Sequence, residues 1–318
     1  MNDDGYGPPD PQRQAAYRGA TTEIVQRLKG GGVRLIVVGS PGAVDSDSFD
    51  KNGPVWTNAE EYNQRTLRDL AEITREVAAQ EGVRFADVHG LFCKVMEKAK
   101  ARFGPGYHVA GADGVHPAAN GHLIIAYAFL KALGCEGTIG TYRIDLAARQ
   151  ATLSEGHRLL SFVDGGVEIE SIRYPFCFYG EPNDSESTRG ILEVLPFNAE
   201  LNRLQLIVTG TSSSRVEVRW GKWSKIFDAA ELNGVNLSSE FLDNPFSGPF
   251  KAVENAVSKQ QQYETTGVHS IWRSLANGWR GRESSWDKTT LERVRELESS
   301  ARAAVKPVSH TLIFTPEP

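Results

Sequence analysis

The run Val33-Arg34-Leu35-Ile36-Val37-Val38 is short and almost wholly apolar, as a strand buried on both faces requires. A helix is predicted before it, over residues 11–29, and Gly30-Gly31-Gly32 ends that helix. Its candidate core positions are Ala15, Ile24, Val25 and Leu28. A helix followed directly by a buried strand indicates an α/β fold, with helices that cover a parallel sheet.

The same alternation continues after this strand. Thr57 caps a second predicted helix, with Glu60 three residues later as in a capping box. The apolar positions of this helix are Tyr62, Leu67, Leu70, Ile73 and Val77. Gly82 ends it, residues 83–88 form a second strand, and helices near 89–102 and 118–133 follow. Residues 1–134 are therefore predicted to form one α/β domain.

The pattern changes after Gly134 to short β-type runs separated by turn residues. The runs are Thr141 to Leu146, Gly166 to Ile172, Gly190 to Leu195, Leu204 to Val208 and Val216 to Trp220. Helices near 248–264 and 287–304 and a last strand at 310–314 follow. Residues 135–318 are predicted to be a β-rich second domain with terminal helices.

Composition limits the possible partners. The net charge is -5 and the chain has no Lys/Arg block, so nucleic acid and anionic membrane surfaces are not expected partners. No stretch reaches the roughly 18 apolar residues of a membrane span, and residues 1–10 are too polar for a signal peptide. The three cysteines, Cys93, Cys135 and Cys177, are predicted to be buried thiols.

A chemical motif stands in the loop before the helix at 118–133: Asp113-Gly114-Val115-His116-Pro117. An acidic residue three positions before a histidine can orient the imidazole through one nitrogen and leave the other to take a proton from a nucleophile. A loop aspartate that caps a helix beside a surface histidine is the alternative interpretation. Pro117 suits the first turn of the helix.

A second candidate lies at the start, in Met1-Asn2-Asp3-Asp4-Gly5-Tyr6. Asn2 at the end of a strand would offer its amide to a developing oxyanion. Taken together, the two blocks resemble the SGNH/GDSL hydrolase family. Met1-Asn2-Asp3 is similar to that family's Gly-Met-Asn-Asp block without its glycine, and Asp113 to Pro117 is similar to its last block, in the right order.

The resemblance implies a flavodoxin-like parallel sheet and a serine ester hydrolase, lipase-like, that uses a Ser-His-Asp triad and no cofactor or metal. His116 would be the general base, Asp113 its orienting acid and Asn2 an oxyanion-hole donor. The β-rich part is similar to the appended region of a bacterial subgroup whose members are often exported. The substrate class implied is a small ester, with acylated carbohydrates the most plausible.

The sequence also departs from the family, because it contains no Gly-Asp-Ser and no glycine block. In the family, both blocks come before the segment that Met1 begins. We therefore expect either a start codon called at an internal methionine or a truncated gene, and a chain that contains only part of the family's sheet. Without the serine nucleophile the present chain is expected to be inactive. Ser40 ends the strand equivalent to the family's fourth strand and is not expected to take the place of the missing serine nucleophile. The apolar strand at 33–38 would become an edge prone to aggregation.

Two other interpretations remain open. One is a non-catalytic module that binds glycan or protein through its β-rich domain, for which Trp220 and Trp223 could stack on sugar, although such residues more often pack in a core. The other makes Asp113, His116 and His108 ligands of a metal.

Overall fold

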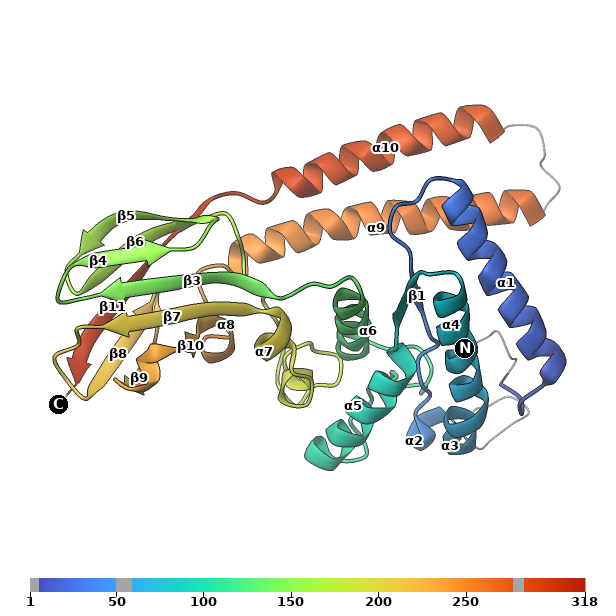
Figure 1. The fold of residues 1–318 in the computed structure, drawn as a ribbon, viewed down its shortest axis with the longest axis horizontal. Coiled ribbons are helices and arrows are strands. Elements are labelled where there is room, and N and C mark those ends of the chain that lie inside the picture. The colour runs from blue at the N-terminus through green and yellow to red at the C-terminus, as the bar shows by residue number, and fades with distance from the viewer. Residues whose placement is uncertain (1–5, 50–58, 277–282, 318) are drawn as a thin grey trace. The chain divides into compact units, whose positions relative to one another are not determined.

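The protein is described by a computed structural model and forms two compact units. The structure describes residues 6–49, 59–276 and 283–317. Unit 1 consists of Met1–Gly137 and Phe178–Leu201, and unit 2 consists of Thr138–Cys177 and Asn202–Pro318. Residues 178–201, which the sequence pattern assigned to the second domain, therefore pack with the first. The fold is mixed α/β, with parallel and antiparallel sheets and a β-rich C-terminal region (Figure 1).

Helices make up most of unit 1, and aspartates begin two of them. Asp10 accepts hydrogen bonds from the N–H groups of Gln12 and Arg13 at 2.8 and 3.1 Å, and Asp87 accepts one from Gly90 at 2.9 Å. The elements are α1 (Pro11–Gly30), β1 (Val37–Gly39), α2 (Ser46–Phe49), α3 (Ala59–Tyr62), the π-helix η2 (Asn63–Leu67), α4 (Arg68–Gln80), β2 (Arg84–Ala86), α5 (Val88–Phe103), α6 (Ala119–Ala132), the 3-10 helix η3 (Gly190–Glu193) and α7 (Phe197–Leu201).

The described strands of unit 1 form a parallel pair, in which Val38 of β1 lies opposite Phe85 of β2. The first strand begins only at Val37, and the chain between α1 and Val37 forms turns and irregular structure. Val33 and Leu35 are 44% and 49% exposed, so the prediction that this run is buried on both faces is wrong for them.

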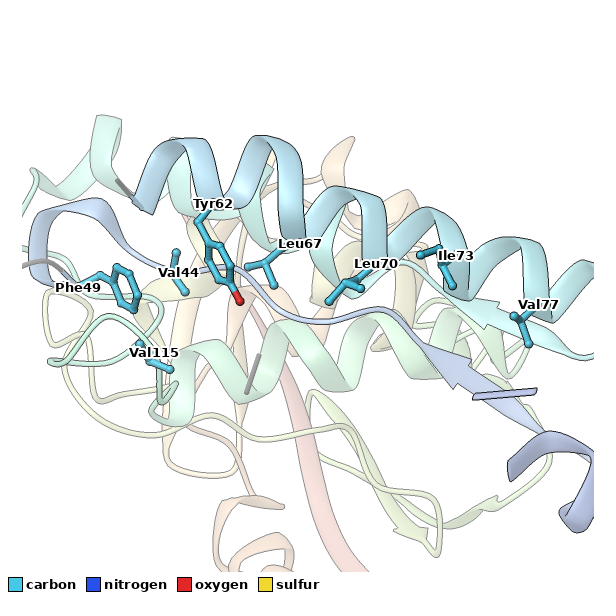
Figure 2. Close-up of a cluster of buried hydrophobic side chains, with 8 residues drawn as sticks. All are labelled: Val44, Phe49, Tyr62, Leu67, Leu70, Ile73, Val77 and Val115. Atoms are coloured by element: carbon cyan, nitrogen blue, oxygen red, sulfur yellow. The ribbon is translucent and has the colours of Figure 1, made fainter. Parts of the chain in front are cut away.

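A cluster of apolar side chains from α2, α3, η2, α4 and two loops forms the core beside this sheet (Figure 2). Its members are Val44, Phe49, Tyr62, Leu67, Leu70, Ile73, Val77 and Val115. The five apolar positions predicted for the helix that follows Thr57 are all in this cluster, which confirms their helical periodicity. Thr57 itself lies outside the described residues.

The predicted core face of α1 is largely wrong. Val25 is buried, but Ala15 is exposed and Ile24 and Leu28 are 58% and 40% exposed. Tyr17 instead packs against the apolar cluster, and polar contacts with α4 add to this, including a 3.0 Å hydrogen bond between the hydroxyls of Tyr17 and Thr74.

Unit 2 holds two sheets and two long helices. A four-stranded sheet has the order β10-β7-β3-β4, in which β3 and β7 are parallel, and a five-stranded sheet has the order β5-β6-β11-β8-β9 with antiparallel neighbours. The elements are β3 (Thr138–Asp145), β4 (Gln150–Leu153), β5 (His157–Val163), β6 (Gly166–Ser171), β7 (Arg203–Thr209), β8 (Arg215–Trp220), β9 (Trp223–Asp228), the 3-10 helix η4 (Glu231–Asn233), β10 (Val235–Asn236), α8 (Leu237–Glu240), α9 (Ser247–Ala276), α10 (Glu283–Ala303) and β11 (Val308–Glu317).

One predicted strand is a helical turn. Residues 190–195 were expected to be extended, but Gly190–Glu193 is the 3-10 helix η3 of unit 1. Ile191 and Leu195 are both buried, and the N–H of Leu195 donates to the carbonyl of Ile191 at 2.9 Å. Burial at a spacing of four is helical periodicity, whereas the strand prediction relied on β-type composition.

Two further sequence expectations have outcomes in the structure. In the described part of the chain, no helix has the length and apolar character needed to cross a bilayer. The prediction of buried thiols holds for Cys177 but is wrong for Cys135, which is exposed, and Cys93 is intermediate.

Candidate active site

Asp113 and His116 are hydrogen-bonded to each other in the loop before α6. His116 Nδ1 lies 2.6 Å from Asp113 Oδ2, and Asp113 Oδ1 accepts the N–H groups of Val115 and His116, each at 2.9 Å. Both carboxylate oxygens therefore hold the same short loop. The contact fixes the imidazole with Nδ1 toward the carboxylate and Nε2 on the opposite side of the ring.

The loop is anchored by the residue between the pair. Val115 is 8% exposed and packs in the core cluster (Figure 2), whereas the side chains of Asp113 and His116 are 57% and 78% exposed. The apolar anchor and the two polar side chains thus have opposite surroundings within four residues. This arrangement keeps the pair at the surface on a backbone tied to the core.

Two glycines make the loop's tight path possible. Gly111 has a φ of +86°, and a Cβ there would lie 1.8 Å from the carbonyl oxygen of His116. Gly114 has a φ of +77°, and a Cβ there would lie 2.7 Å from the backbone nitrogen of Phe49. Because any larger residue would displace the backbone at both positions, these glycines define where the His116 ring stands.

Asp45 connects this loop to the sheet. Its N–H donates to the carbonyl of Gly114 at 2.9 Å, and it comes from the segment that follows the carboxyl end of β1. Sites in α/β folds gather at the carboxyl ends of parallel strands. The Asp113–His116 loop is therefore fixed to a segment that leaves this end of the sheet.

The Asp45 side chain is fully buried beside the ammonium group of Lys100. Lys100 contacts Asp45 Oδ1, which also accepts the N–H of Asp47 at 3.0 Å, and Lys100 contacts Asp47 as well. Asp45 Oδ2 faces His108 Nδ1 at 3.8 Å, and neither atom has a hydrogen-bond partner among the described residues. The ammonium of Lys100 thus supplies the opposite charge that a buried carboxylate needs.

The surroundings of Asp113 favour its ionised form. Partial burial acts to raise the pKa of Asp113, but the hydrogen bonds from the His116 ring and from the N–H groups of His116 and Val115, with the charge of the imidazolium, lower the pKa to about 2. The carboxylate is therefore available to stabilise a protonated His116. Burial and then the negative charge of Asp113 raise the pKa of Tyr6, so the chain after the Met1–Gly5 block passes within electrostatic reach of the pair.

The other predicted site residues are separate from the pair or outside the description. Asn2 lies outside the described residues. Ser40 is 7% exposed, and its Oγ accepts the N–H of His89 at 2.8 Å, at the start of α5. Among the described residues, no serine hydroxyl forms a hydrogen bond with His116.

The metal interpretation finds no support in the geometry. No group of three or more His, Cys, Asp or Glu side chains in the described ranges is placed to hold a metal ion. His108 faces Asp45 rather than Asp113. Trp220 is fully buried in unit 2, as the core interpretation of that residue predicted.

The sequence reasoning did not find Asp45, Lys100 and Asp47. One signal was present, since Asp45-Ser46-Asp47-Ser48 follows a predicted strand, the position at which α/β proteins place polar site residues. Lys100 lies within α5 and carries no local signal, because only the tertiary packing brings it to Asp45.

Comparison with known proteins gives a fold and no family. No family model matches the chain, and no curated protein matches it. A solved structure described as a gut microbial diltiazem-metabolizing enzyme aligns with all of this chain and 82% of its own, at a TM-score of 0.68 and 20% sequence identity. At that identity the likeness concerns the fold, and this chain therefore shares the fold of that enzyme along its whole length.

Proposed function

We propose that the protein is an SGNH/GDSL-type serine ester hydrolase in which unit 1 supplies the acid–base pair. The observation that carries the proposal is the 2.6 Å contact between Asp113 Oδ2 and His116 Nδ1 on a loop anchored in the core by Val115. An imidazole held in this way keeps one tautomer, with the proton on Nδ1 and a lone pair on Nε2.

Each residue has a defined role in this proposal. His116 Nε2 takes the proton of a serine hydroxyl as that oxygen attacks the ester carbonyl, and then gives it to the departing alkoxide. Asp113, ionised at neutral pH, stabilises the imidazolium between these two transfers. Asn2 is assigned to the oxyanion hole by family resemblance alone.

The substrate proposed is a small ester, and an acylated carbohydrate is the most plausible class. The structural neighbour acts on a small molecule, diltiazem, which supports an enzyme with a small-molecule substrate. No cofactor enters the proposed chemistry. Because the sequence contains no Gly-Asp-Ser, the 318-residue chain assayed alone is expected to lack hydrolase activity.

The coding sequence upstream of Met1 and an esterase assay together test the proposal. An in-frame Gly-Asp-Ser roughly a hundred residues earlier would support it, and a product that includes it should hydrolyse p-nitrophenyl acetate. His116→Ala should lower that rate by roughly 10²- to 10⁴-fold. Equal rates for the two proteins would refute the assignment of His116, and an upstream stop codon would favour the non-catalytic binding module.

The chain as it stands provides a second test with a fluorophosphonate probe, which labels activated serines. We expect no stoichiometric labelling, since no described serine is hydrogen-bonded to His116. Labelling of a single serine would show that the nucleophile is present in this chain. If that serine were Ser40, Ser40 would be the nucleophile after all.

A further inference from the structure

Unit 2 contains a cavity of about 250 Å³ at one end of its two sheets. Three turns contribute to its lining, namely those between β3 and β4, between β5 and β6, and between β7 and β8. Residues of strands β5, β6, β8 and β11 complete it. The residues that matter for recognition are Leu146, Arg149, Phe162, Thr211, Ser212 and Phe314. Ligand sites usually measure roughly 300 to 1,000 Å³, so this cavity suits a single ring rather than an oligomer.

Arg149 gives the cavity its charge. Of the described residues that line the cavity, Arg149 alone is charged, and it forms no salt bridge with any described residue. Its guanidinium lies over the ring of Phe162, with the central carbon 5.5 Å from the ring centroid. A cation stacked on an aromatic face keeps its in-plane N–H donors free for an anion.

The backbone around Arg149 is held in an uncommon conformation. Arg149 has a φ of +51°, one of two positive values among the described non-glycine residues. The turn before it is fixed by Asp145, whose Oδ1 accepts the N–H of Ala148 at 2.8 Å, and by Gly210, where a Cβ would lie 2.7 Å from the nitrogen of Ala147. The fold therefore maintains a strained residue at this rim, and such strain is more frequent at ligand sites than elsewhere.

The remaining lining defines the body of the ligand. The faces of Phe162 and Phe314 and the side chain of Leu146 are apolar, while the hydroxyls of Thr211 and Ser212 offer hydrogen bonds at the edge. We propose that this cavity binds a carboxylate carried on a single six-membered ring, with the carboxylate on Arg149 and the ring against Phe162. The site belongs to unit 2 and its argument does not depend on the proposed hydrolase function.

Titration of the full chain with D-glucuronate and with benzoate, followed by NMR, tests the proposal. At least one acid should bind, and its neutral counterpart, glucose or methyl benzoate, should bind at least tenfold more weakly. Binding of glucuronate alone identifies a sugar acid as the natural class, and binding of benzoate alone identifies an aromatic acid. Failure of both acids to bind would overturn the proposal.

Variants assign the binding to this cavity. Arg149→Gln should weaken the acid roughly tenfold, because a charge-assisted contact is lost. Arg158→Gln is the matched control, since it removes one arginine from the same unit outside the cavity lining, and it should change the affinity by less than about twofold. Phe162→Leu keeps an apolar wall without the aromatic face and should also weaken binding. Unchanged affinity in folded Arg149→Gln would place the acid elsewhere and refute the site.

Discussion

The Asp113–His116 pair of unit 1 and the buried His157–His310 cluster of unit 2 place the same side chain in opposite surroundings. The His116 side chain is 78% exposed and has one hydrogen-bond partner among the described residues, a carboxylate. His310 is 5% exposed and His157 9%, and both are surrounded by hydroxyl and indole groups. One arrangement leaves a ring nitrogen available for chemistry, and the other uses every nitrogen to hold the fold.

The buried cluster forms a complete chain of hydrogen bonds. Trp220 Nε1–H donates to His310 Nδ1 at 3.1 Å, so the proton of His310 is on Nε2, which donates to Ser171 Oγ at 3.1 Å. Ser171 then donates to His157 Nδ1 at 2.8 Å and accepts the hydroxyl proton of Tyr142 at 3.1 Å. His157 Nε2–H finally donates to a backbone carbonyl at 3.2 Å. Every donor has an acceptor with both rings neutral, which indicates a structural role.

The largest effect expected from this contrast is on stability. His310→Ala leaves the indole N–H of Trp220 without its acceptor in a closed interior, takes one donor from the hydroxyl of Ser171 and creates a cavity. It should lower the free energy of unfolding by about 3 kcal/mol. His116→Ala removes the same side chain from the surface and should cost less than about 0.5 kcal/mol. Urea denaturation of both variants makes the comparison, and equal losses would contradict it.

The dependence of stability on pH should separate the two clusters next. Burial, then the nearby His157, lowers the pKa of His310 to about 3, and burial first, then Arg173, lowers the pKa of His157. The unfolded chain binds more protons than the folded chain below the ordinary histidine pKa of about 6.5. Stability should therefore fall as the pH drops from 6.5 toward 3, by at most about 1.4 kcal/mol per pH unit for each histidine.

Urea denaturation at pH values between 6.5 and 5 tests this pH dependence, because most carboxylates titrate only below that range. The slope should decrease in the His310→Ala variant, because one of the two buried neutral histidines is then absent. Asp113 contributes at lower pH, because its pKa is depressed and the stability it adds is lost only between about 3.8 and 2. An unchanged slope in folded His310→Ala would contradict the assignment of the acid sensitivity to the buried cluster.

The part of the fold that the sequence predicted is the part with local signals. The apolar spacing of Leu67, Leu70 and Val77 gave the helix that builds the core, and Asp113 and His116 stand three residues apart, close enough for one loop to bring them into contact. The buried cluster of unit 2 had no such signal, because Tyr142, Ser171 and His310 come from strands far apart in the chain and meet only through sheet register. For the same reason, no local pattern in the sequence indicates the contact between Lys100 and Asp45.

A smaller effect concerns the support of the exposed pair. Asp45→Asn removes the buried negative charge that faces Lys100, and should destabilise unit 1 by about 1 to 3 kcal/mol. Asp47→Asn is the matched control, since its side chain is 44% exposed and it also contacts Lys100, and it should cost less than about 0.5 kcal/mol. Because Asp45 holds Gly114 through its backbone, the NMR signal of the His116 Nδ1–H should survive in both folded variants. Its loss in Asp45→Asn would show that the buried charge, rather than the backbone contact, positions the pair.

The last comparison is between two sheet edges. Here we expect no change in stability, but a difference in ANS binding and aggregation. Among the described strands β1 pairs only with β2, and Leu35, just before β1, is 49% exposed. The edge strand β9 of unit 2 has a similarly exposed residue, Ile226 at 44%, but Lys225 stands beside it. Charges on an edge strand oppose pairing with other chains. Strand β9 itself contains Lys225 and Asp228, whereas β1 contains no charged residue and Arg34 lies before it. Leu35→Lys should therefore reduce ANS fluorescence and aggregation by about half, and Ile226→Lys should change them little, with the urea midpoint unaltered in both. Weak ANS binding by the unmodified chain, in a monomer that melts in one cooperative step, would show that the first edge is covered in solution.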